Sequence, residues 1–255
     1  MAVWDPSQYL KFADHRLRPA LDLLARVPLD RPGTIVDLGC GAGNVTRHLA
    51  DRWPEARVIG VDSSPQMLSK ARGILPDASW VEGDIATWTP PAPGDLIYSN
   101  AALHWLGDHG GLFPRLMGLL APGGVLAVQM PRNYEAPSHT RLLDTAVSGP
   151  WRERLAPLVR PSPVAAPEAY HRALAGPGRT LDIWETVYMQ VLEGENPVAE
   201  FTKGTALKPL LDALEEPQRS QFETEYRRRI AAAYQREADG TTLFPFRRLF
   251  IIART

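Results

Sequence analysis

Three glycines in one short turn are the first residues of this chain that point to chemistry. Gly39, Gly41 and Gly43 occupy every second position directly after the apolar run TIVDL, which contains Asp37. Glycine loses more backbone freedom on folding than any other residue, so this density indicates a turn that something approaches closely. In such a turn, backbone N–H groups and the start of a helix can bind a ligand without interference from Cβ atoms. The stretch therefore predicts a ligand-binding turn between a strand and a helix.

Further acidic residues follow the next two apolar runs. Asp62 and Ser63 follow the second run, and Asp84 follows the third. A carboxylate at Asp62 can accept hydrogen bonds from both hydroxyl groups of a ribose. At Asp84, a carboxylate and the next backbone N–H, that of Ile85, can read the edge of an adenine. One such acid alone is often a helix cap, but acids at the ends of three successive strands favour a ligand that contains a nucleoside.

The spacing of the glycines separates two classes of ligand. A dinucleotide-binding turn requires G-x-G-x-x-G, but Asn44 stands where the third glycine should be. The Asp-x-Gly-x-Gly-x-Gly pattern instead resembles the motif of class I S-adenosylmethionine-dependent methyltransferases, whose cationic ligand suits an acid beside the turn. The resemblance implies S-adenosyl-L-methionine as cofactor, with the backbone carbonyl of Asn100 accepting from the methionine amine. The cofactor-binding residues that it implies are Asp37, Gly39, Gly41, Gly43, Asp62, Ser63, Asp84, Ile85 and Asn100.

The elements that must position these residues follow from the apolar periodicity. Short runs rich in β-branched residues and bounded by Gly, Pro or Asp predict strands at 34–38, 57–61, 78–82, 96–99, 124–130, 180–192 and 246–254. Helical spacing between the first five runs predicts βαβ units and a parallel sheet with helices on both faces. The expected fold class is α/β, a Rossmann-like doubly wound sheet of about seven strands. The family resemblance implies that the last strand is antiparallel.

Three segments do not fit this alternation, although the whole chain 1–255 is expected to form one methyltransferase domain. Residues 5–27 have a helical pattern, with a break expected near Pro19. Residues 134–176 and 197–238 carry further helical segments. We interpret 5–27 as an N-terminal helical lid and the other two as helical cap insertions over the open end of the sheet.

Bulk composition excludes several classes of protein. The formal net charge of −1 over 255 residues argues against a general nucleic-acid binder. The single cysteine, Cys40, excludes an internal disulfide and fits a reducing compartment. We expect no secretory leader, because the first residues contain early acids and no long apolar core. The sequence also has no apolar run long enough to cross a membrane and no Cys/His/acid cluster with metal-ligand spacing. We therefore expect a cytoplasmic protein with a small-molecule substrate and without a metal, a nucleic acid, a membrane or an obligate protein partner.

A closer resemblance extends over nearly the whole chain. It implies S-adenosylmethionine-dependent methyl transfer to a carboxylate of trans-aconitate, giving a monomethyl ester. Methylation of another small or lipid carboxylic acid, and a non-catalytic cofactor-binding subunit, are the alternatives. A non-catalytic subunit would usually have lost one of the three acids, and all three are present. The segments similar to the trans-aconitate 2-methyltransferase family are WDPSQYLKFADHRLRPALDLLARVP (4–28), NAALHWL (100–106), GVLAVQMP (124–131), LDIWETVY (181–188) and RLFIIAR (248–254).

The chemistry of that substrate determines which residues to look for. A carboxyl group has a reference pKa near ~4, so at neutral pH it is already a nucleophilic anion and needs no general base. Three carboxylates require cationic partners, and arginine suits bidentate carboxylate binding. Each candidate also has a plain structural alternative, in ion pairs or core packing, and Arg16 could instead hold the carboxylate of the cofactor. The substrate-binding candidates are the arginines Arg16, Arg18 and Arg248, the aromatic residues Tyr9 and Trp105, and His104 after the fourth strand.

Overall fold

The fold is that of a computed structural model, which describes residues 13–159 and 161–255, with side chains from residue 17 onward. The chain divides into two compact units, each with its own core. The first, called the sheet unit, comprises Leu17–Pro131, Pro163–Thr186 and Arg248–Thr255. The second, called the helical unit, comprises Arg132–Ser162 and Val187–Arg247 of the described side chains. The candidate chemistry lies in the sheet unit, so that unit is described first.

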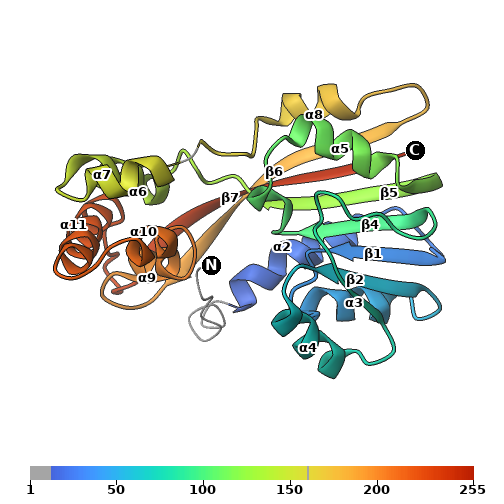
Figure 1. The fold of residues 1–255 in the computed structure, drawn as a ribbon, viewed down its shortest axis with the longest axis horizontal. Coiled ribbons are helices and arrows are strands. Elements are labelled where there is room, and N and C mark those ends of the chain that lie inside the picture. The colour runs from blue at the N-terminus through green and yellow to red at the C-terminus, as the bar shows by residue number, and fades with distance from the viewer. Residues whose placement is uncertain (1–12, 160) are drawn as a thin grey trace. The chain divides into compact units, whose positions relative to one another are not determined.

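A seven-stranded sheet in the order β3-β2-β1-β4-β5-β7-β6 organises the chain (Figure 1). Strands β1 to β5 pair in parallel, and β7 pairs antiparallel to β5. The predicted doubly wound sheet with an antiparallel last strand is therefore confirmed. The strands are β1 (Thr34–Leu38), β2 (Arg57–Asp62), β3 (Ser79–Glu82), β4 (Gly94–Asn100), β5 (Leu120–Pro131), β6 (Thr180–Leu192) and β7 (Thr242–Arg254).

Helices between the strands bury the apolar positions that predicted them. Leu49 of α3 (Asn44–Arg52) and Leu68 of α4 (Pro65–Ile74) are almost fully buried, and both helices pack against β2. The hydroxyl of Ser64 caps α4 by accepting from the backbone N–H of Met67 at 3.3 Å. On the other side of the strand order, α5 (His109–Met117) packs against β5, and α8 (Pro167–Leu174) packs against α5 (Figure 1).

Strands β5 and β7 each begin four residues earlier than their sequence patterns predict. Strand β5 starts at Leu120 although Gly123 and Gly124 follow, and a register shift opposite Gly94 accommodates these glycines. Strand β7 starts at Thr242 because buried Thr242 and Phe244 alternate with exposed Leu243 and Pro245. In β5 the pairing with the neighbouring strand determines where the strand begins, and in β7 the alternation of buried and exposed residues does so. Local strand propensity does not.

The expected helix break near Pro19 is wrong. Helix α2 (Ala13–Ala25) continues through this proline. Proline removes one helical hydrogen bond, but Ala20 and Leu23 of the same helix are fully buried. The carbonyl of Ala20 also accepts a hydrogen bond from the hydroxyl of Tyr98 on β4 at 2.6 Å. Packing and this bond outweigh the lost backbone bond.

The helical unit has an aromatic core of its own. Tyr226, fully buried, hydrogen-bonds the hydroxyl of Thr202 at 2.9 Å and donates to the carbonyl of Ser138 at 3.0 Å. The ring of Trp151 meets Phe222 edge-on at 5.3 Å. Whether these helices act as a cap, and 5–27 as a lid, stays a prediction. The helices of this unit are α6 (Pro137–Ser148), α7 (Arg152–Leu155), η2 (Ala156–Leu158), α9 (Pro197–Lys203), α10 (Lys208–Asp212) and α11 (Gln218–Ala233).

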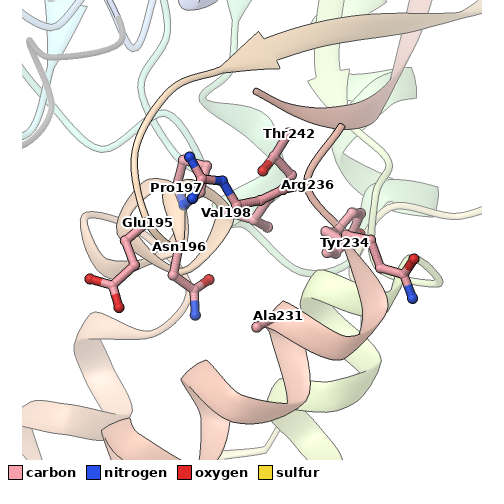
Figure 2. A pocket seen from close by; sticks show the side chains of 9 residues that line it. Glu195, Asn196, Pro197, Val198, Ala231, Tyr234, Arg236 and Thr242 are labelled. Atoms are coloured by element: carbon pink, nitrogen blue, oxygen red, sulfur yellow. The ribbon is translucent and has the colours of Figure 1, made fainter. Parts of the chain in front are cut away.

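A small cavity of about 270 Å³ lies inside the helical unit, between the start of α9 and the end of α11 (Figure 2). Its polar side chains already hold loops together. The Asn196 amide donates to the carbonyl of Arg227 at 2.8 Å, and the Arg236 guanidinium donates to the carbonyl of Gly240 at 3.1 and 3.0 Å. In the part of the chain that the structure describes, no helix is long and apolar enough to cross a membrane.

Candidate cofactor and substrate site

The strand order places the candidate residues at one edge of the sheet. Strands β2 and β3 lie on one side of β1, whereas β4 and β5 lie on the other side. The winding therefore reverses between β1 and β4, and parallel α/β sheets bind ligands at the carboxyl ends of the strands at such a reversal. The glycine turn follows β1, and the predicted residues Asp62, Asp84 and Asn100 lie at or just after the ends of β2, β3 and β4.

The three glycines differ in what surrounds them. All adopt left-handed backbone angles, with φ of 76° at Gly39, 55° at Gly41 and 83° at Gly43. A Cβ at Gly39 would lie 2.2 Å from the Cβ of Ala102, and one at Gly43 would lie 3.0 Å from the ring of Trp80. At Gly41, no atom of the described residues lies within 4 Å of that position. The protein itself fills the space beside the outer two glycines, so the backbone open to a ligand is that of Gly41.

Asp62 ties this turn to the end of β2. One carboxylate oxygen accepts from the backbone N–H of Gly41 at 2.9 Å, and the other accepts from Ser64 at 2.9 Å. A carboxylate oxygen can accept more than one hydrogen bond, so both oxygens keep capacity for a ligand hydroxyl. The neighbouring Ser63 is exposed. The arrangement fits a ribose diol beside the open backbone of Gly41.

Asp37 is the buried acid of the turn. Its carboxylate accepts from the hydroxyl of Thr46 on α3 at 2.6 Å. Burial raises its pKa from 3.8 to about 7, the Thr46 hydrogen bond opposes this, and the negative charge of Asp62 adds to it. Thr46 was not singled out in the sequence. The acid is therefore close to its titration point at neutral pH, where a nearby cationic ligand would favour the charged form.

We expect this raised pKa to make the protein less stable as the pH rises from about 4 to about 7. The unfolded chain releases the proton near 3.8, whereas the folded chain holds it until about 7. Ionising the buried acid therefore opposes folding, by about 4 kcal/mol once the pH exceeds the folded pKa. Denaturant unfolding of the wild type and of Asp37→Asn, between about pH 4 and about pH 7, measures this change in the free energy of unfolding. The variant's stability advantage should grow up to about pH 7 and then level off; a constant difference would contradict the shift.

The turn after β3 is held by a residue that the sequence did not reveal. Arg115 of α5 donates to the carbonyl of Trp88 at 3.0 Å and to that of Ile85. Asp84 is exposed, and one of its oxygens accepts from the N–H of Ala86 at 2.9 Å. The Ile85 side chain lies 3.3 Å from the Cβ position of Gly39, so this turn adjoins the glycine turn. Arg115 on α5 and the apolar contact of Ile85 therefore fix the position of this turn beside the glycine turn.

At the end of β4, one buried polar atom has no hydrogen-bond partner among the described residues. The side-chain oxygen of Asn100 is buried and accepts no hydrogen bond from any described residue. Ala101 has a left-handed φ of 51°, and its N–H donates to the carbonyl of Gln129 at 2.9 Å. Left-handed backbone at a residue with a Cβ is strained and clusters at functional sites. A buried acceptor at this edge of the sheet suits a ligand ammonium group.

His104 and Trp105 lie in the short helix η1 (Leu103–Trp105) that follows. His104 is 8% exposed, and its Nδ1 has no hydrogen-bond partner among the described residues. Burial, together with the smaller electrostatic effects of Arg248 and His109, lowers its pKa to about 3. His104 is therefore neutral at physiological pH. Trp105, whose ring centroid is 4.6 Å from that of His104, is 67% exposed, which leaves its face available to a ligand.

A second histidine, which the sequence pattern did not single out, positions η1. One ring nitrogen of His109 bonds the carbonyl of Leu103 at 3.0 Å, and the other bonds the hydroxyl of Tyr170 at 2.6 Å. That hydroxyl also accepts from the N–H of Ala165 at 3.2 Å. Helix α8 therefore braces, through α5, the segment that carries His104. The supporting role of α8 is visible only from its contact with α5.

Arg248 is the buried cation of the site. It is 5% exposed on β7, and it donates to the side-chain oxygen of Gln129 on β5 at 3.4 Å. Its charge reaches His104, as the lowered pKa of that imidazole indicates. The structure therefore brings Arg248, His104 and Gln129 together. Gln129 was missed, although a glutamine inside the apolar run GVLAVQM is a signal in itself.

Of the remaining predicted residues, Arg18 is described and is not part of this cluster. The Arg18 side chain is largely exposed on α2 and forms an ion pair with Asp22 at 3.9 Å. Arg16 belongs to α2, but its side chain lies outside the described residues, as does Tyr9. Cys40 is buried, and burial together with the charges of Asp37 and Asp62 raises the pKa of its thiol. A thiol in this state is a poor nucleophile.

Comparison with known proteins agrees with this geometry. The family model described as a methyltransferase domain matches residues 35–124. The chain is 50% identical to the trans-aconitate 2-methyltransferase of Azoarcus sp. strain BH72, over 99% of both chains. It is 48% identical to the protein of that name from Rhodopseudomonas palustris, again over 99% of both chains. It is 49% identical to the one from Streptomyces coelicolor, over 99% of this chain and 86% of that one.

Solved structures share the fold at low sequence identity. The YcgJ protein of Bacillus subtilis has a TM-score of 0.60 at 12% identity, over 93% of this chain and 98% of that chain. An S-adenosylmethionine-dependent methyltransferase of Mesorhizobium loti has a TM-score of 0.51 at 23% identity, over 92% and 96%. The strand order and the glycine turn define the chain as a class I S-adenosylmethionine-dependent methyltransferase. More particularly, it belongs to the trans-aconitate 2-methyltransferase family.

The surroundings of the glycines predict opposite effects for the same substitution. Gly41→Ala should raise the dissociation constant of S-adenosylmethionine about tenfold or more, because the new Cβ enters the space left for the ligand. Its left-handed backbone adds a modest strain of about 1–2 kcal/mol. Gly39→Ala should instead lower the melting temperature more, because its Cβ would collide with Ala102 at 2.2 Å. Calorimetric titration and thermal unfolding measure both. Equal effects of the two variants on both quantities would contradict the distinction.

Proposed function

We propose that this enzyme transfers a methyl group from S-adenosylmethionine to a carboxylate of trans-aconitate, giving a monomethyl ester. The observation that carries the proposal is the buried Arg248 beside the segment that follows β4, where the substrate of such an enzyme should lie. A buried guanidinium is a suitable partner for a carboxylate. The names of relatives at 46–50% identity support the same substrate.

The residues around the glycine turn fit the cofactor. The backbone at Gly41 is open, Asp62 retains acceptor capacity for a ribose diol, and Asn100 has a buried oxygen that suits an ammonium group. Asp84 and the backbone N–H of Ile85 are assigned to hydrogen bonding with the adenine edge. Gly39, Gly43 and Ser63 are assigned to shaping the turns that hold the cofactor. Asp37 supplies negative charge close by. When bound, S-adenosylmethionine supplies an electrophilic methyl group to an ionised carboxylate.

The chain's own contribution is to bind, orient and exclude water. The substrate carboxylate is ionised at neutral pH, so no residue is required to remove a proton. His104, neutral at physiological pH, is assigned to hydrogen bonding rather than to proton transfer. Arg248 binds one carboxylate so that another is presented to the methyl group, and Trp105 lines the site. Holding the two reactants in line accounts for much of the rate in such reactions.

The arginines on or before α2 have separate proposed roles. Arg16 binds a second carboxylate of the substrate or the carboxylate of the cofactor. Arg18 is a weaker candidate, because it already pairs with Asp22 at an exposed site. Tyr9 remains a candidate for the wall of the methyl-transfer pocket.

Methyl transfer from radiolabelled S-adenosylmethionine to a panel of acids tests the proposal. The panel contains trans-aconitate, cis-aconitate, citrate, a dicarboxylic acid and a fatty acid, and the product is identified by mass spectrometry. We expect trans-aconitate to give the highest kcat/KM and a single methyl ester. A higher kcat/KM for the fatty acid or the dicarboxylic acid would show that this acid, and not trans-aconitate, is the substrate. Cofactor binding without any turnover would favour a non-catalytic subunit.

A further inference from the structure

The segment between β4 and α5 has left-handed backbone at both ends. Among the described residues other than glycine, only Ala101 and Asp108 have such angles, with φ of 51° and 46°. Left-handed angles cost an alanine free energy because its Cβ crowds the backbone, whereas aspartate and asparagine tolerate them. Asp108 also gains a local bond, since its carboxylate caps α5 by accepting from the N–H of Gly111 at 3.1 Å. The side chain of Ala101 has no group that could compensate in this way.

Ala101 is kept in this conformation by contacts with parts of the chain that are distant in sequence. Its N–H donates to the carbonyl of Gln129 on β5 at 2.9 Å. The methyl group of the next residue, Ala102, fills the space beside Gly39, where it lies 2.2 Å from the position that a Cβ would take. Strained backbone persists only where its surroundings hold it, and it concentrates at functional sites. The strain at Ala101 therefore calls for a functional reason.

The backbone angle at Ala101 determines where η1 lies. A residue with extended backbone would continue the direction of β4, whereas a left-handed residue turns the chain. Ala102 then contacts the glycine turn, and η1, which carries two of the substrate-binding candidates, follows directly. The carbonyl of Leu103 at the start of η1 accepts from Nε2 of His109 at 3.0 Å. The turn at Ala101 thus brings η1 beside the residues that the cofactor should contact.

The spacing between these two segments matters for the reaction. Gly41, whose backbone is open to a ligand, follows Gly39 by two residues, and His104 follows Ala102 by two residues. Methyl transfer requires the substrate oxygen and the methyl carbon at a defined separation, and a misplacement of about 1 Å can cost about 100-fold in rate. A shift of Ala102 away from Gly39 would change this separation.

We propose that Ala101 is a positioning residue for the methyl transfer, because its left-handed backbone turns the chain so that η1 lies against the glycine turn. The methyl side chain of Ala101 takes no part in the chemistry, and the backbone angle is what counts. This inference rests on the proposed function, since it requires that η1 lines the acid substrate and that the glycine turn binds S-adenosylmethionine. A residue that accepts a left-handed angle should support turnover at position 101, and one that resists it should not.

Ala101→Asn and Ala101→Thr test the backbone angle separately from the size of the side chain. Both new side chains are polar and of similar size, but asparagine tolerates left-handed angles whereas β-branched threonine does not. At saturating cofactor, kcat for trans-aconitate should fall about 10- to 100-fold in Ala101→Thr and stay within about threefold of wild type in Ala101→Asn and Ala101→Gly. The dissociation constant of S-adenosylmethionine, from calorimetric titration, should change less than about threefold in all three variants.

Ala213 provides the control for the substitution itself. It is partly buried, as Ala101 is, but it has an ordinary φ of −82° and lies at the end of α10 in the helical unit. Threonine adopts such an angle without strain, so Ala213→Thr should keep kcat within about threefold of the wild type.

The results separate positioning from a role in stability alone. In the latter case Ala101→Thr would lower the melting temperature but keep the wild-type kcat well below that temperature, which would overturn the inference and leave the proposed function standing. Equal losses of kcat in Ala101→Asn and Ala101→Thr would also overturn it, because side-chain size would then be the cause. A wild-type protein that methylates no acid of the panel overturns the proposed function and this inference with it. If Ala101→Thr fails to fold, Ala101→Leu takes its place, since leucine has the branched outline of asparagine without its tolerance of left-handed angles.

Discussion

Replacing Arg248 by Met should lower kcat/KM for trans-aconitate about 30- to 1,000-fold, equivalent to roughly 2–4 kcal/mol of transition-state stabilisation. Arg248 is 5% exposed, so a substrate carboxylate bound to it is removed from water and interacts strongly. Methionine has a similar length and an apolar end, so it fills the space without supplying charge or donors. Steady-state kinetics with varied trans-aconitate at saturating cofactor measure the effect.

Two further variants show whether the effect is that of a carboxylate clamp. Arg248→Lys retains the charge but loses the two-pronged geometry, so it should still lower kcat/KM. Arg247→Met is the matched control, because Arg247 is the preceding residue and its side chain is exposed. The dissociation constant of S-adenosylmethionine should barely change in any of them. If Arg248→Met leaves kcat/KM unchanged, the clamp lies elsewhere, with Arg16 the next residue to test.

Replacing Asp62 by Ala should weaken cofactor binding by roughly 1.5–3 kcal/mol, which raises the dissociation constant about 10- to 150-fold. The variant removes the acceptor for the ribose hydroxyls. It also releases the backbone N–H groups of Gly41 and Ser64, which the carboxylate now holds at 2.9 Å each. Asp62→Asn retains one acceptor oxygen and should lie between wild type and Asp62→Ala. Calorimetric titration with S-adenosylmethionine and with its demethylated product gives the values.

Asp95 offers a control of matched geometry for Asp62. Like Asp62, it accepts from two backbone N–H groups, although here one oxygen takes both, those of Gly33 and Thr34, at 2.8 Å each. These groups lie at the amino end of β1, opposite the glycine turn. Asp95→Ala should therefore lower stability without changing cofactor affinity. Normal cofactor binding by Asp62→Ala, or binding of NAD in preference to S-adenosylmethionine, would overturn the assignment of this residue.

Local patterns in the sequence determined the order and type of the main elements. The run TIVDL forms β1 with the predicted bounds, and residues 180–192 form β6 as predicted. Apolar periodicity suffices here because a strand or a helix buries one face against the core, whatever its partner is. The glycine turn is equally local, since left-handed backbone at three alternate positions selects glycine directly. The class of protein therefore follows from the sequence.

Partners far apart in the chain were decided only by the tertiary structure. Gln129 and Arg248 are 119 residues apart, and His109 and Tyr170 are 61 residues apart. No local pattern encodes such a pairing, because it depends on which strands and helices become neighbours. The same holds for the glycines, where Ala102 approaches Gly39 while Gly41 stays open. Sequence spacing shows that a backbone must be approached, but only packing shows whether the protein or a ligand approaches it.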